Sequence, residues 1–179
     1  QNKVEIQVPL LPQQQAIVLM NALPRLGKAA LRDKKNVLKH IGGHPKALEL
    51  LDGWLDGECC LDDFLQSSET QTHIAGAWQA HFVDALLERL APGEREVLNI
   101  LVIWNHPFCA NTISHITEVL PQHTTPLLER WQRIWLIDFH HTDDENQLWY
   151  TLHPVIQEYL NVQQSLDVRK LLHAHIAKY

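Results

Sequence analysis

The chain has 179 residues, 45% of them hydrophobic and 20% charged, and a formal net charge of −6 at pH 7. This mixture is typical of a globular protein and excludes a fibrous or largely disordered chain. The acidic balance argues against a nucleic-acid partner held by a strong positive field, and no apolar run is long enough to span a membrane, so we expect no membrane partner.

The first half of the chain predicts a short strand followed by helices. Residues 4–8 alternate between apolar and polar and precede two prolines, which indicates a strand or linker within residues 1–12. Apolar residues then recur at helical spacing. We expect helices over residues 13–23, around 37–41 after a basic stretch at 28–35, over 45–55, over 61–65 and over 72–90. Together they predict a small helical domain over residues 13–88.

The second half predicts another domain, which begins near Pro92. Two β-rich runs enclose a polar turn and indicate a hairpin. Helices are expected over residues 92–104, 110–119, 124–134, 154–160 and 166–177, and strands over 135–140 and 148–152. Three helices followed by a two-stranded wing is the order of a winged helix. The fold class is therefore mainly α: a helical bundle, a winged-helix domain at 89–162 with a β-hairpin wing, and a final helix within 163–179.

Two short motifs stand at helix starts. Gly42-Gly43-His44-Pro45 is a glycine-rich turn that leads into a helix opened by proline. Leu152-His153-Pro154 places a histidine between a strand and the next helix. Taken alone, the first is an ordinary loop-to-helix junction and the second an ordinary capping or core histidine.

Taken together and in this order, these motifs resemble those of the STAND class of signalling ATPases, also called the NB-ARC or AP-ATPase family. Gly43-His44-Pro45-Lys46-Ala47 is similar to the family's G-L-P-L-A motif, with His44 and Lys46 in place of two leucines. Leu152-His153-Pro154 is similar to the M-H-D motif, with Pro154 in place of the aspartate. In that family a nucleotide-binding domain precedes a helical domain and a winged helix.

The resemblance implies a regulatory role. Residues 1–12 would leave an upstream nucleotide-binding domain, Gly43 and Pro45 would lie at the nucleotide with Pro45 against adenine, and His153 would reach the β-phosphate of ADP. ADP or ATP is expected as cofactor only together with that upstream domain. The last helix would lead into a downstream sensor of helical repeats such as tetratricopeptide repeats, and the full-length protein would oligomerise on activation.

No sequence signature supports catalysis by this chain itself. It contains no G-x-x-x-x-G-K-[ST] phosphate loop and no apolar strand ending in paired acids, so we expect no ATP hydrolysis and no catalytic residue. The twelve histidines are scattered, and neighbours such as His140 and His141 should face apart on a strand, so no metal site is expected. Cys59, Cys60 and Cys109 form no disulfide framework, which indicates a reducing, cytoplasmic compartment.

Two further expectations complete the sequence-based picture. The chain opens on Gln1 and stops within a helical pattern, so we expect a fragment of a larger protein. The alternative function is a winged-helix regulator that binds DNA or protein, with Arg130 and Arg133 on the helix in the recognition position. Because this helix also carries Glu129 and Trp131, intramolecular packing is the preferred interpretation.

Overall fold

The computed structural model describes residues 10–56, 59–69, 78–117, 119–142 and 147–177. The chain divides into two compact units, Gln1–Trp78 and Gln79–Tyr179. The described residues are mainly helical, with ten α-helices and one two-stranded antiparallel sheet, so the mainly α prediction is confirmed. The strand expected at residues 4–8 and the centre of the polar turn at 143–146 lie outside the described residues.

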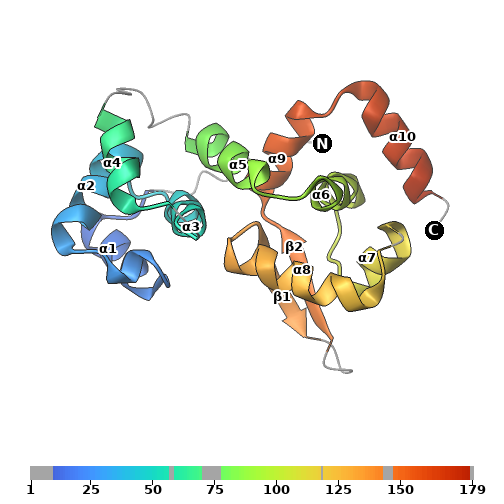
Figure 1. Ribbon diagram of the computed structural model, residues 1–179, viewed down its shortest axis with the longest axis horizontal. Coiled ribbons are helices and arrows are strands. Elements are labelled where there is room, and N and C mark those ends of the chain that lie inside the picture. The colour runs from blue at the N-terminus through green and yellow to red at the C-terminus, as the bar shows by residue number, and fades with distance from the viewer. Residues whose placement is uncertain (1–9, 57–58, 70–77, 118, 143–146, 178–179) are drawn as a thin grey trace, which may run out of the picture. The chain divides into compact units, whose positions relative to one another are not determined.

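The first unit is a cluster of helices around an apolar core (Figure 1). Its helices are α1 (Gln13–Ala22), α2 (Leu31–Ile41), α3 (Pro45–Trp54) and α4 (Leu61–Glu69), with a 3-10 turn at Leu26–Lys28. Fully buried apolar side chains come from all four helices and include Met20, Val37, Leu48 and Phe64. The expected helices are therefore present, and α2 begins earlier than predicted because it includes most of the basic stretch.

Two buried charged side chains explain this earlier start and fix the connection from α1 to α2. Lys34 is only 5% exposed, and its Nζ donates to Asn21 Oδ1 (2.7 Å) and to the Gly27 carbonyl (3.0 Å). Asp52 of α3 is fully buried and accepts hydrogen bonds from the backbone amides of Arg25 and Leu26. Burial of a charged group is tolerated only where such partners exist, and these partners lie far away in the sequence.

The second unit contains the other six helices and the hairpin. They are α5 (Trp78–Glu88), α6 (Pro92–Trp104), α7 (Ala110–Thr117), α8 (Pro121–Arg133), β1 (Ile137–Thr142), β2 (Leu148–Leu152), α9 (Pro154–Gln163) and α10 (Leu166–Ile176). Fully buried Trp131 is the largest side chain of its core. Pro92 and Pro154 open their helices as predicted, as Pro45 does in the first unit.

Helix α5 belongs to the second unit, whereas we expected it in the helical domain that ends at residue 88. Gln163 Nε2 of α9 donates to Asp84 Oδ1 of α5 at 3.4 Å. Burial, together with a hydrogen bond to Asp84, raises the pKa of Tyr159 on α9 to about 12. These polar contacts join α5 to α9, and a local helical pattern cannot reveal them.

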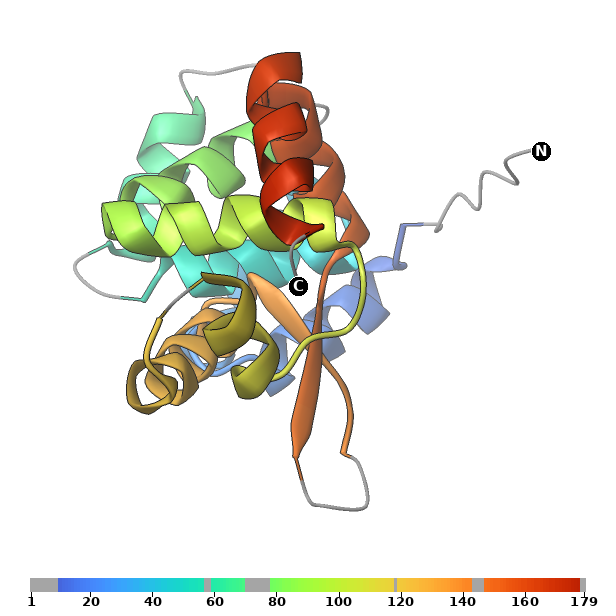
Figure 2. The ribbon, with the colours of Figure 1, turned by 90° about the vertical axis from the view of Figure 1, so that its right-hand side faces the viewer.

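The hairpin pairs β1 with β2, which run side by side in Figure 2. Phe139 lies opposite Tyr150, and a β-bulge separates this pair from the next, His141 and Trp149. The bulge brings the rings of His140 and His141 to 4.8 Å, so the expectation that these neighbours face apart is wrong. Phe108, in the loop between α6 and α7, also exchanges two backbone hydrogen bonds with Tyr150 (2.9 and 2.8 Å).

Candidate functional site

The Gly42-Gly43 turn joins α2 to α3 in a backbone conformation that requires glycine. Gly42 has φ 70° and ψ −166°, a region that residues with a side chain rarely adopt. Gly43 is buried, and its carbonyl accepts the amide of Leu11 at 2.9 Å. A Cβ on Gly43 would overlap the Leu11 carbonyl oxygen. The turn therefore holds the segment that enters α1 by close backbone contact.

Pro45 follows two residues later, half-buried at the first position of α3. Lys46, which stands where the family has leucine, is also buried, with 2% of its side chain exposed. Its Nζ lies 3.3 Å from Glu49 Oε2 on the next turn of the helix. Because this carboxylate balances the buried charge, lysine can occupy the position of an apolar residue. Gly43 and Pro45 thus lie close together at the junction of α2 and α3.

His44 gives this turn a pH dependence. Burial lowers the pKa of His44 below its ordinary value of 6.5, so the folded chain resists protonation there more than the unfolded chain does. The contribution of His44 to the free energy of unfolding is therefore fully present above the pKa that His44 has in the unfolded chain. It is lost as the pH falls toward the lower pKa that His44 has in the folded chain. Between about pH 7.5 and about pH 5.5 the urea concentration at the unfolding midpoint should fall less in His44→Leu than in the unsubstituted chain. An unchanged pH profile would show that other groups cause the loss.

His153 belongs to the second unit and lies between β2 and α9. Its Nδ1 accepts the backbone amide of Val155 at 3.2 Å, so the side chain caps the helix that Pro154 opens. A neutral imidazole has one protonated nitrogen. Since Nδ1 is the acceptor, the proton of the neutral ring is on Nε2, which is then a hydrogen-bond donor. The cap fixes the tautomer without the aspartate of the family motif.

The contacts of Arg130 bear on the DNA alternative. Its Nη1 donates to Glu94 Oε1 (2.6 Å) and its Nη2 to the Arg89 carbonyl (3.1 Å), which fastens α8 to the start of α6. Glu94 also accepts the amide of Ala91 at 2.9 Å. Arg133 is exposed, but Glu129 is also exposed on the same helix, and its negative charge opposes binding to a DNA backbone. One of the two arginines expected to read DNA is thus engaged by partners within the unit.

Sequence reasoning missed the residues that hold the connection from α1 to α2 in place. Asp52 and Lys34 are polar residues in helices whose local pattern predicts a solvated face, yet both are buried. The only local signal is the position of Asp52 among buried apolar residues of α3, next to Leu51. Their partners lie 7 to 27 residues away, so the pairing is invisible in a short window.

A search with models of protein families found no match, and a search of curated proteins found no significant match. Among the described helices, none is long and apolar enough to cross a membrane. No cluster of three or more His, Cys, Asp or Glu side chains suited to a metal ion occurs in the part of the chain that the structure describes. Function must therefore be inferred from the two motifs and their surroundings.

Proposed function

We propose that this chain is the helical and winged-helix part of a nucleotide-dependent signalling switch of the STAND type. It closes over ADP bound to an upstream P-loop domain and rearranges when ATP replaces ADP. The bound nucleotide, ADP or ATP, then determines which of two arrangements of the domains is more populated. The chain itself performs no chemistry. Pro45 packs against the adenine, the Gly42-Gly43 turn allows close approach, and His153 contacts the β-phosphate.

The observation that carries the proposal is the cap formed by His153. With Nδ1 accepting the amide of Val155 at 3.2 Å, the neutral ring presents an N–H at Nε2. Such an N–H is suited to a phosphate oxygen, because a hydrogen bond to a charged acceptor is stronger than one between neutral groups. The histidine therefore has the tautomer that a phosphate sensor needs even though Pro154 replaces the family's aspartate.

The topology of the second unit supports the winged-helix part of the proposal. Helices α6, α7 and α8 precede the hairpin, and the backbone pairing of Phe108 with Tyr150 forms an isolated β-bridge beside β2. A segment between the first two helices that pairs with the second hairpin strand is also found in winged helices, which supports this part of the proposal. In this arrangement β2 leads directly into His153, so the sheet positions the histidine.

Nucleotide content of the full-length protein tests the proposal. We expect a G-x-x-x-x-G-K-[ST] loop before residue 1 and stoichiometric ADP in the purified protein, released on denaturation and measured by chromatography. Replacing the loop lysine is the matched control and should remove the ADP. A full-length protein with neither the loop nor bound nucleotide would refute the proposal.

A further inference from the structure

The positive charges of the chain are concentrated in α2 and the turn before it. Residues 28–39 contain five of the fifteen Lys and Arg and one acidic residue, so this stretch carries +4 while the rest of the chain carries −10. Lys34 is buried and holds the fold. Arg32, Lys35 and Lys39 are exposed, and none of them forms an ion pair within the described residues.

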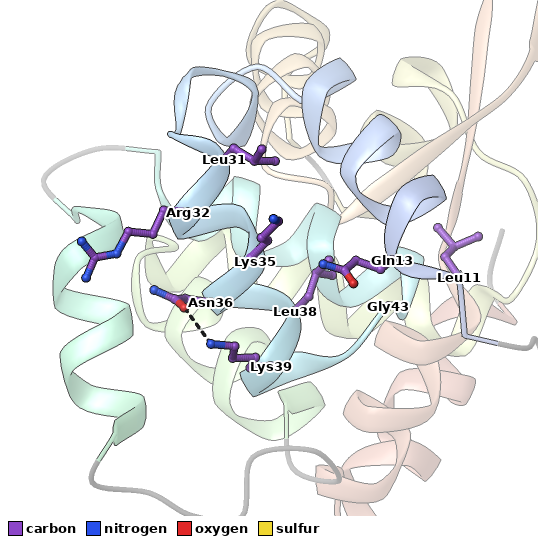
Figure 3. A pocket seen from close by; sticks show the side chains of 9 residues that line it. All are labelled: Leu11, Gln13, Leu31, Arg32, Lys35, Asn36, Leu38, Lys39 and Gly43. Atoms are coloured by element: carbon purple, nitrogen blue, oxygen red, sulfur yellow. Dashed lines mark hydrogen bonds between the residues drawn. The ribbon is translucent and has the colours of Figure 1, made fainter.

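These three cations line a cavity of about 910 Å³ in the first unit, which we name the basic groove. Figure 3 shows Arg32, Lys35 and Lys39 spaced along α2. Lys39 Nζ donates a hydrogen bond to Asn36 Oδ1 at 3.4 Å. Apolar side chains of Leu11, Leu31 and Leu38 complete the wall, and no acidic side chain of the described residues lines it. The basic groove thus combines positive charge with apolar surface.

The spacing of these groups indicates an extended ligand. Arg32 and Lys39 are seven residues apart on one helix, which corresponds to about 10 Å along its axis. A single phosphate group cannot contact both ends. Leu31 is 55% exposed. A ligand that covers this apolar side chain lowers the free energy of the complex. The ligand should therefore carry several anionic groups together with apolar ones at comparable spacing.

We propose that the basic groove is a docking surface for an acidic amphipathic helix of a partner protein. Glu or Asp side chains at positions i, i+3 and i+7 of such a helix repeat the spacing of the cations on α2. Apolar side chains beside them cover Leu31 and Leu38 in the manner of helix-in-groove recognition. A nucleic-acid backbone would satisfy the cations but leave the leucines uncovered. Of the residues proposed to contact the nucleotide, Gly43 borders the basic groove, whereas Pro45 and His153 do not line it. The proposal goes beyond the nucleotide switch because it assigns a protein partner to the exposed cations of α2.

The test measures binding of the 179-residue chain to a synthetic helical peptide of about 14 residues with Glu at i, i+3 and i+7 and Leu beside them. The matched peptide has Gln in place of Glu. We expect the Glu peptide to bind more tightly, and increasingly so at low salt. Lys35→Glu with Lys39→Glu should weaken binding by at least about tenfold. The control is Arg95→Glu with Lys170→Glu, at exposed positions of the second unit. This double variant makes the same change of net charge and should leave peptide binding unaltered.

Three results would overturn the proposal. The Glu peptide could bind no better than the Gln peptide, or the two double variants could lose binding equally. Duplex DNA or phosphatidylserine vesicles could bind more tightly than the peptide and lose this binding in the Lys35→Glu, Lys39→Glu variant, which would make a polyanion or a membrane the ligand. Because all four substituted side chains are exposed, we expect the circular dichroism of both variants to match that of the unsubstituted chain.

Discussion

Replacing Asp52 with alanine is expected to lower the free energy of unfolding of the first unit by about 3 kcal/mol. The fully buried carboxylate accepts the amides of Arg25 (2.9 Å) and Leu26 (2.8 Å) through Oδ1 and Nη1 of Arg25 (3.0 Å) through Oδ2. Alanine leaves these donors without their acceptor in a buried setting, which costs more than the net value of the bonds. Urea denaturation measures the loss of stability, and amide hydrogen exchange shows whether that loss is confined to the first unit.

Asp56→Ala is the matched control for this prediction. Asp56 pairs with the same arginine, through Nη2 at 2.8 Å, but its side chain is 37% exposed. Exposed ion pairs contribute less than about 1 kcal/mol, so the control should change stability little. Equal effects of the two substitutions would show that Asp52 acts only as a partner of Arg25 and not as the acceptor for the backbone of the connection.

Gly43→Ala is expected to lower the free energy of unfolding of the same unit by about 2 kcal/mol. The new methyl group overlaps the Leu11 carbonyl oxygen, so the segment before α1 must move and the 2.9 Å bond from the Leu11 amide is strained or lost. Hydrogen exchange at the amide of Leu11 should accelerate together with the loss of urea resistance.

Gly93→Ala provides the comparison that isolates this contact. Gly93 lies in the first turn of α6, and a Cβ there would meet no atom within 4 Å. Alanine is the better helix former, so this variant should be more stable by about 0.5 kcal/mol. If both glycine substitutions stabilise the chain, the close packing of Gly43 on Leu11 is not a determinant of the fold.

Local sequence signals predicted much of the fold because they act within a few residues. Pro45, Pro92 and Pro154 each open a helix as expected, since the fixed φ of proline suits that position wherever it occurs. The hairpin strand Leu148–Leu152 was likewise predicted from two β-rich runs that enclose a polar turn. Element type and order followed from periodicity without knowledge of the tertiary contacts.

Features set by distant partners could not be predicted in this way. The early start of α2 depends on acceptors for Lys34 at Asn21 and Gly27, and the assignment of α5 to the second unit depends on contacts from α9. The bulge beside His140 depends on the pairing register of β1 with β2. A histidine before a proline suggests a cap, but only the distance from Nδ1 to the Val155 amide identifies the tautomer.

The dissociation rate of ADP from the full-length protein tests the proposed switch most directly. If His153 Nε2 donates to the β-phosphate, His153→Ala should accelerate ADP release by about tenfold, because a hydrogen bond to a charged group contributes on the order of 1.5 kcal/mol. His123→Ala, at an exposed position of α8, is the matched control and should leave the rate unchanged. An ADP dissociation rate in His153→Ala equal to that of the unsubstituted protein would contradict the assignment of His153 as the phosphate sensor.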